Sequence, residues 1–336
     1  GSGCLRINGE EVKRFRNTHG GRSLDYTLQV KAGVPYDIEL DFEYFRSDAQ
    51  LNFDIGFKQK VNIDASVACV KDADVVVFAG GISPLLEGEE MGVNLPGFRG
   101  GDRTDIELPA VQRELIHALH RAGKKIILVN CSGSPIALEP ETKNCEAILQ
   151  AWYPGQAGGT AVADVLFGDY NPGGRLPVTF YRNMSQLPDF EDYNMTGRTY
   201  RYMTQQPLFP FGYGLSYTTF EYGNLSLTKE QIKVGEPLKL TVNVTNNGQR
   251  DGEEVVQVYL KKQDDAEGPG KTLRAFKRVR IPAGKSVEVV FDLNGKELEW
   301  WDAQSNTMRV CAGRYDVMVG KSSQDRDLQR RSFVIE

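Results

Sequence analysis

The chain has 336 residues, of which 40% are hydrophobic and 25% are charged, and its formal net charge is −5. These values are ordinary for a globular protein, and the length allows two or three domains. The acidic balance argues against a nucleic-acid partner, because phosphate binding needs a clustered excess of Lys and Arg. No apolar run approaches the roughly 18 residues that a membrane-spanning helix requires, so we expect no membrane span.

The cysteines and histidines offer few candidates for metal binding or nucleophilic chemistry. The five cysteines lack C-x-x-C spacing, which indicates neither a zinc site nor a dense disulfide framework and leaves their pairing open. His117 and His120 lie on a predicted helix and are expected to be solvated. The sequence therefore implies no metal and no cofactor.

Residues 4–60 have the alternating pattern of β-strands. Cys4 to Ile7 leads into Asn8-Gly9, a strong hairpin signal, and further strands are predicted at Tyr26 to Val30, Tyr36 to Tyr44 and Leu51 to Ile55. These are too few strands for a closed sandwich. We interpret this segment as a fragment of a β-domain.

Residues 61–222 change to a strand and helix pattern. Ala73 to Phe78 and Lys125 to Val129 are nearly all apolar, as expected of strands buried on both faces of a parallel sheet. Ala147 to Trp152 is predicted to be a third strand, and Pro109 to Ala122 and Gly159 to Phe167 are predicted helices. The apolar helix face is expected to comprise Val111, Leu115, Ala118 and Leu119. This pattern predicts part of a mostly parallel α/β sandwich, followed by a docked strap to residue 222.

Residues 223–336 have about seven short predicted strands separated by turns, as an immunoglobulin-like β-sandwich requires. The strands include Leu238 to Val244, Val255 to Leu260, Val287 to Leu293 and Arg314 to Val319. The expected fold class is thus α/β plus all-β, with an N-terminal β-rich fragment.

The most unusual local feature is the run Leu86-Glu-Gly-Glu-Glu-Met91, in the loop after a predicted parallel strand. Such loops are where open α/β sheets place functional groups. Crowding of Glu87, Glu89 and Glu90 favours the protonated form of one of them, and a protonated carboxyl is what a general acid needs. The alternative is an acidic solvated loop. Asp102 and Arg103, further along, are expected to brace the loop.

Two long blocks carry a resemblance to a known family. Trp152 to Phe180, with Trp-Tyr-Pro-Gly-Gln-Ala-Gly-Gly at its start, resembles the signature of the α/β sandwich domain in glycoside hydrolase family 3. Phe209-Pro-Phe-Gly-Tyr-Gly-Leu-Ser-Tyr217 resembles the strap that follows it in that family. Gly313 to Gly320 resembles its fibronectin type III-like domain. Residues 4–60 look like the second half of a protective-antigen-type β insert.

This resemblance implies a division into residues 4–60, 61–222 and 223–336, and a retaining mechanism with two carboxylates. The family's nucleophile is an Asp on an N-terminal (β/α)8 barrel, which we expect to be missing here and to be a partner of this chain. The family's acid/base is a Glu on a sandwich-domain loop. Matching that loop to Gly88-Glu89-Glu90 makes Glu89 the first candidate for the acid/base, followed by Glu87 and Glu90.

The resemblance also implies an exo-acting β-glycosidase of plant-wall oligosaccharides. Arg198-Thr-Tyr-Arg-Tyr202 resembles the strap of members that act on β-xylosides, which favours a β-xylosidase over a β-glucosidase. Trp152 and Tyr153 are expected to be core and turn residues in preference to sugar-stacking ones. We expect a periplasmic or extracellular location.

Other readings remain open. The chain could be a non-catalytic carbohydrate-binding module or a structural accessory fragment, and by itself it is expected to be inactive because the nucleophile is missing. The sequence leaves the preferred sugar, the linkage and the oligomeric state undetermined.

Overall fold

The structure, a computed structural model, describes residues 2–16, 25–44, 51, 53–57, 59–89 and 91–336. The chain forms two compact units, Gly1–Val61 and Asn62–Glu336, which are described separately. The boundary falls close to the end of the first predicted segment. The predicted boundary at residues 222 and 223 lies inside the second unit.

The first unit contains one antiparallel sheet. Its strands are β1 (Ser2–Ile7), β2 (Glu10–Arg16) and β3 (Ile38–Glu43), in the order β2-β1-β3. Asn8 and Gly9 form the turn between β1 and β2 with φ of 51° and 82°, so the hairpin prediction is confirmed.

Two other strand predictions in this unit are wrong. Tyr26 to Val30 forms no strand, and Tyr26 and Val30 are exposed. The described residues between Leu51 and Ile55 also form no strand; Asn52 lies outside the described residues. Alternation shows that a segment fits a pleated sheet, but a strand also needs a neighbour for its backbone hydrogen bonds.

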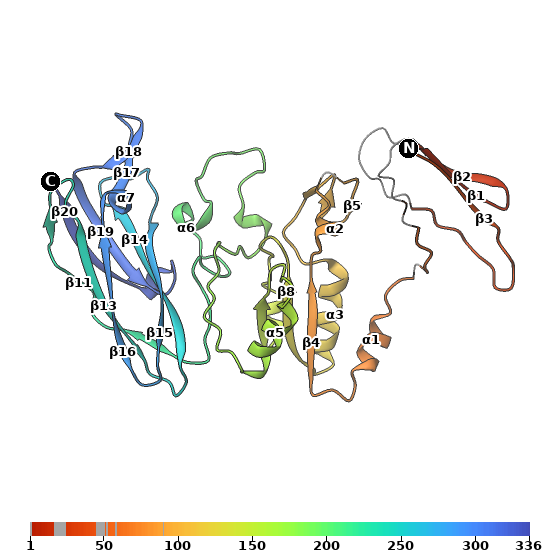
Figure 1. Ribbon diagram of the computed structural model, residues 1–336, viewed down its shortest axis with the longest axis horizontal. Helices are drawn as coiled ribbons and strands as arrows, with labels where there is room; N and C mark the ends of the chain where they lie inside the picture. Colours follow the sequence, from red (N-terminus) through yellow and green to blue (C-terminus); the bar gives the residue numbers. More distant parts are fainter. Residues whose placement is uncertain (1, 17–24, 45–50, 52, 58, 90) are drawn as a thin grey trace. The chain divides into compact units, whose positions relative to one another are not determined.

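The second unit contains a parallel sheet in the order β4-β8-β9, of which β4 and β8 are labelled in Figure 1. The strands are β4 (Val75–Gly81), β8 (Lys125–Cys131) and β9 (Ala147–Gln150), so the prediction of at least three parallel strands is confirmed. The accompanying helices are α1 (Ile63–Cys69), α3 (Ala110–Arg121), α4 (Glu141–Asn144) and α5 (Gly158–Phe167).

The core of this layer lies between the sheet and the helices α1 and α3. Ile116 and Leu119 of α3 are buried against Ile126 and Leu128 of β8, and Val67 of α1 packs on the same cluster. The predicted helix face is partly wrong, since Val111 is exposed and Ile116 is the most buried residue of α3. His117 and His120 are exposed, as predicted.

Strand β4 is less buried than its apolar sequence predicts. Val75 and Val77 are 46% and 52% exposed, whereas Val76 and Phe78, which point to the opposite face, pack on the helix-covered core. The expectation of burial on both faces is therefore wrong for β4. It is correct for the middle of β8, where Ile126, Leu128 and Val129 are buried.

The strap after α5 contains a short 3-10 helix, η1 (Met184–Gln186), and α6 (Thr199–Tyr202). Tyr200 of α6 stacks on Phe211 with ring centroids 4.5 Å apart and meets Tyr259 of the following domain edge-on at 5.8 Å. Its hydroxyl accepts a hydrogen bond from the backbone N–H of Leu273 at 3.1 Å. The strap is docked, as expected from its aromatic content.

The C-terminal part is a β-sandwich of two sheets (Figure 1). One sheet is built on β13 (Leu238–Asn246), which pairs with β10 (Phe220–Tyr222), β11 (Ser226–Leu227) and β16 (Ser286–Leu293). The other has the order β12-β20-β19-β14-β15, with β12 (Gln231–Ile232), β20 (Leu328–Ile335), β19 (Gly313–Gly320), β14 (Gly252–Lys262) and β15 (Thr272–Ile281).

Smaller elements complete the sandwich. They are α7 (Gly295–Leu298), the hairpin of β17 (Glu299–Asp302) and β18 (Thr307–Val310), and η2 (Asp325–Asp327). The alternating side chains of β13, Leu238, Leu240, Val242 and Val244, are fully buried between the sheets. The predicted all-β domain is confirmed.

A buried ion pair joins the segment after α5 to the sandwich. Arg175 donates a 3.0 Å hydrogen bond to the Glu254 carboxylate of β14, and both side chains are almost inaccessible to solvent. Burial raises the pKa of Glu254, while the adjacent Arg175 cation opposes that rise. Removing one partner of such a pair leaves an uncompensated buried charge.

We therefore expect Arg175→Met to lower the free energy of unfolding by about 3 kcal/mol at neutral pH. Because the folded pKa of Glu254 is raised, protonation of this carboxyl stabilises the folded state in acid, and that contribution is lost as the pH rises through the folded pKa. The loss from Arg175→Met should thus be smaller at about pH 5 than at about pH 7. Denaturant unfolding at both pH values measures it.

Arg280→Met is the matched control. Arg280 and Asp251 form a 3.0 Å ion pair that is exposed to solvent, and such pairs contribute about 1 kcal/mol or less. Equal losses from the two substitutions would contradict the assigned role of the buried pair.

Candidate functional site

The glutamate-rich loop begins where the chain leaves β4. The backbone of Gly81 is held by Gln112 of α3, whose side chain accepts from the Gly81 N–H and donates to the Gly81 carbonyl, each at 2.8 Å. One helical turn follows, α2 (Pro84–Glu87), and the Ser83 hydroxyl caps it by accepting from the Leu86 N–H at 3.2 Å. These contacts fix the N-terminal end of α2.

Gly88 ends this turn in the left-handed conformation, with φ of 64°. A Cβ atom added at Gly88 would lie 2.4 Å from a methyl group of Val93, so a larger residue cannot fit without movement. The residue therefore has both a backbone and a packing reason to be glycine.

The structure places the predicted carboxylates in different surroundings. Glu87 is half-buried at the end of α2, and its carboxylate accepts a 3.4 Å hydrogen bond from the Ser134 hydroxyl. Glu89 is exposed on the loop. Glu90 lies outside the described residues.

Arg103 approaches the same serine from the other end of the loop. It lies in β7 (Asp102–Arg103), which pairs with β6 (Phe98–Arg99) and through it with β5 (Asn94–Leu95). Its guanidinium donates to the Ser134 hydroxyl at 3.2 Å and to the Glu107 carbonyl at 3.0 Å, and it lies 5.7 Å from the centre of the Phe98 ring. The predicted bracing role of Arg103 agrees with these contacts, whereas Asp102 is exposed.

Burial is the main influence on the pKa of Arg103. Desolvation lowers the pKa of the Arg103 guanidinium, and the nearby carboxylates of Asp105 and Glu87 oppose that change. Tyr153 also interacts with Glu87; burial first, and then its hydrogen bond to Glu87, raise the pKa of the Tyr153 phenol. Glu87 is thus surrounded by a hydroxyl, a phenol and a cation.

A chain of buried polar groups lies behind Ser134. The Ser132 hydroxyl donates to the Ser134 carbonyl at 2.9 Å, and the Asn130 and Gln150 side-chain amides donate to the Ser132 hydroxyl at 3.2 Å. Asn130 also donates to Gln150 at 2.7 Å. Sequence reasoning missed Ser134 and Ser132; the available signal was their place directly after the second predicted strand.

The two aromatic residues after β9 differ in exposure, since Trp152 is half-buried and Tyr153 is 40% exposed. Trp152 adopts φ of 56° and packs edge-on against Phe180 with a centroid distance of 6.2 Å. Tyr153 packs against the backbone of Gly133, where an added Cβ would lie 2.6 Å from its ring.

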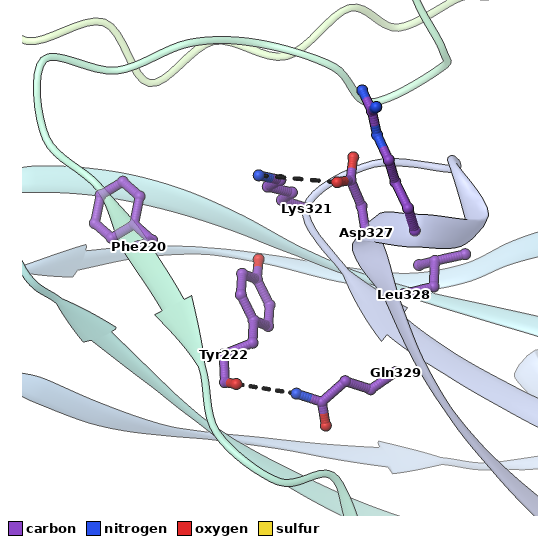
Figure 2. Close-up of a pocket in the computed structure, with 7 residues that line it drawn as sticks. Phe220, Tyr222, Lys321, Asp327, Leu328 and Gln329 are labelled. Carbon is purple, nitrogen blue, oxygen red and sulfur yellow. Dashed lines mark hydrogen bonds and ion pairs between the residues drawn. The ribbon is translucent and has the colours of Figure 1, made fainter.

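Two surface hollows accompany these features. The first, about 470 Å³, is lined by the loop itself at Asn94, Leu95, Pro96, Gly97, Phe98, Arg99 and Thr104. The second, about 230 Å³, lies in the β-sandwich beside Phe220, Tyr222 and Lys321 (Figure 2). There Lys321 lies 3.8 Å from the Asp327 carboxylate and Gln329 donates to the Tyr222 carbonyl at 3.0 Å, so the polar groups largely bind one another. None of the predicted site residues lines the second hollow.

The described part of the chain contains no cluster of three or more His, Cys, Asp or Glu side chains that could hold a metal ion. Among the same residues, no helix is long and apolar enough to cross a membrane. All five cysteines are free thiols.

Comparison with known proteins identifies two domains, the first of which begins within the first compact unit. Residues 10–217 match the glycosyl hydrolase family 3 C-terminal domain, and residues 254–323 match a fibronectin type III-like domain. A parallel α/β domain followed by such a β-sandwich defines the C-terminal portion of a glycoside hydrolase. The chain belongs to glycoside hydrolase family 3.

Several curated proteins are similar to this chain. It is 52% identical over 309 residues to the xylan 1,4-beta-xylosidase of Xylanibacter ruminicola, covering 92% of this chain and 36% of that protein. It is 38% identical to the periplasmic beta-glucosidase of Salmonella typhimurium, covering 78% of this chain and 34% of that protein. The chain thus spans roughly a third of the length of these relatives.

Solved structures agree with the family assignment. The β-glucosidase EmGH1 of Erythrobacter marinus aligns with a TM-score of 0.70 at 37% identity, covering 82% of this chain and 36% of that one. A β-glucosidase of Bifidobacterium adolescentis aligns with a TM-score of 0.70 at 33% identity, covering 81% and 40%.

The geometry of Gly88 leads to a prediction about the loop. Gly88→Ala should lower the free energy of unfolding by more than the roughly 1 kcal/mol that a left-handed backbone costs a non-glycine residue, because its Cβ also meets Val93. Gly100→Ala is the control, since Gly100 has a similar φ of 59° but open space around its Cβ position. Denaturant unfolding of both variants tests this, and equal losses would show that the contact with Val93 is unimportant.

Proposed function

We propose that this chain is part of a retaining, exo-acting β-glycosidase that removes terminal β-linked xylose from plant-wall oligosaccharides. The observation that carries the proposal is a carboxylate-bearing loop at the carboxyl end of β4, in the family 3 domain of a chain that is 52% identical over 309 residues to part of a protein named xylan 1,4-beta-xylosidase. The α/β domain contributes the acid/base, and a barrel domain outside this chain contributes the Asp nucleophile.

Glu89 is the proposed acid/base. Its exposed position on the loop suits a group that must reach a sugar bound by another domain, whereas Glu87 faces Ser134 and is engaged within the α/β domain. In the first step Glu89 protonates the glycosidic oxygen as the bond to the anomeric carbon breaks and the nucleophile forms a glycosyl-enzyme. In the second step Glu89 removes a proton from water as the water attacks the anomeric carbon, and the configuration is retained.

A β-glucosidase is the alternative specificity, because relatives with similar coverage carry that name. The proposed location is the periplasm or the cell exterior; the name of the Salmonella typhimurium relative supports it.

In the intact enzyme, we expect Glu89→Gln to reduce kcat about 10²-fold to 10⁴-fold on xylo-oligosaccharides, because general acid catalysis of leaving-group departure is lost. For aryl β-xylosides with good leaving groups, which depart without protonation, kcat/KM should fall much less, whereas kcat should stay low because hydrolysis of the glycosyl-enzyme lacks its general base. Azide should restore turnover on those substrates by attacking the glycosyl-enzyme without general-base help, and the product should be a β-xylosyl azide. Near-normal rates on natural oligosaccharides would refute the assignment.

A second experiment separates the catalytic proposal from that of an accessory module. This chain alone should not hydrolyse an aryl β-xyloside, since the proposed nucleophile lies in another domain. Measurable hydrolysis that is abolished by Glu89→Gln would place a nucleophile within this chain. Xylo-oligosaccharide binding by the isolated chain, measured calorimetrically, would support the carbohydrate-binding alternative.

A further inference from the structure

We propose that Glu87, Ser134 and Arg103 form a latch that fixes the loop carrying Glu89, and that Glu87 is a positioning residue for the reaction. This inference rests on the proposed function of Glu89. It adds a role for a second carboxylate of the run and for two residues that are distant from it in the sequence.

The latch closes the loop at its base. Glu87 comes directly before the loop and Arg103 lies at its far end. Both residues bind the same hydroxyl group of Ser134. The serine accepts from the Arg103 cation at 3.2 Å and donates to the Glu87 carboxylate at 3.4 Å, so each hydrogen bond has a charged partner. Tying both ends to one point reduces the conformational freedom of the segment between them.

Burial makes the latch specific for these groups. Only 15% of the Arg103 side chain is exposed, so its charge has left water and depends on nearby acceptors. Its hydrogen-bond acceptors are Ser134 and the Glu107 carbonyl, its ion-pair partner is Asp105 at 3.9 Å, and the negative charge of Glu87 acts on it from further away. Because the Arg103 Nε is already buried without a hydrogen-bond partner, loss of a further acceptor would leave the cation still less well satisfied.

The latch also reaches the interior of the loop. The Arg103 guanidinium lies over the Phe98 ring of β6, and Phe98 is itself buried in the core of the layer. Ser134 is also connected through Ser132 to the side-chain amides of Asn130, which is buried, and Gln150, which is half-buried. The loop is therefore connected to the carboxyl ends of β8 and β9.

The decisive experiment compares glutamine and alanine at Glu87 and Glu89 in the intact enzyme. Gln keeps the oxygen that accepts from Ser134, so Glu87→Gln should keep kcat within about threefold of wild type, while Glu87→Ala should lower it about tenfold to a hundredfold through loss of alignment. Neither variant should be rescued by azide, and the pH profile of kcat should keep its shape. Glu89→Gln and Glu89→Ala should both lose activity strongly and both be rescued.

Hydrogen exchange provides a readout that is independent of activity. In this chain, Glu87→Ala and Ser134→Ala should each accelerate amide exchange about tenfold or more in residues 91–100 and leave β8 unchanged. Glu114→Ala, which removes an exposed carboxylate of α3, is the matched control and should change neither region.

The outcomes separate the two proposals. Unchanged exchange and kcat in Glu87→Ala would overturn the latch, whatever the behaviour of Glu89. If Glu87→Gln were as inactive as Glu87→Ala, and if azide rescued both variants, the positioning role would be overturned and Glu87 would be the reacting carboxylate. Normal activity of Glu89→Gln together with faster exchange in Glu87→Ala would refute the proposed acid/base while the structural latch stands.

Discussion

The in-register parallel pairing of β4 with β8 is the constraint on which the candidate site depends. The two strands are aligned from Val75 opposite Lys125 to Gly81 opposite Cys131, and the Ile82 N–H continues the ladder by donating to the Cys131 carbonyl at 2.8 Å. Because both strands end at the same edge, the segments that follow them must meet there. A shift of one residue would turn the side chains of β4 to the opposite face and separate those segments.

Local sequence was sufficient for elements whose signal lies within the element itself. The apolar run of β8 predicts a strand buried on both faces, and the alternation of β13 predicts a strand buried on one face. The pair Asn8-Gly9 predicts a turn with left-handed backbone. In each case the residue types themselves carry the signal. The segment from Tyr26 to Val30 failed because strand formation also depends on a partner. The exposure of Val77 could not be predicted, since it depends on what covers the far face of the sheet.

The candidate site was predictable as a region and less so in its details. The run of three glutamates after a parallel strand identified the loop, but Glu87 and Glu89 have the same residue type, so their different surroundings follow only from the end of α2 at Gly88. Ser134 was not identified because a single serine has no pattern. Its contact with Arg103 exists only when two strand ends and the far end of the loop come together.

The buried ion pair of Arg175 and Glu254 has a consequence for exchanging domains among relatives. A β-sandwich taken from a relative without the matching arginine would place the buried Glu254 carboxylate against a neutral surface. An α/β domain joined to a sandwich that lacks the glutamate would leave the buried Arg175 cation without its partner. The two residues are therefore expected to be inherited together. Chimeric enzymes that cut between residues 175 and 254 should be designed with both positions taken from one parent, because this junction discriminates against mismatched halves in the way that charge complementarity selects partners at protein interfaces.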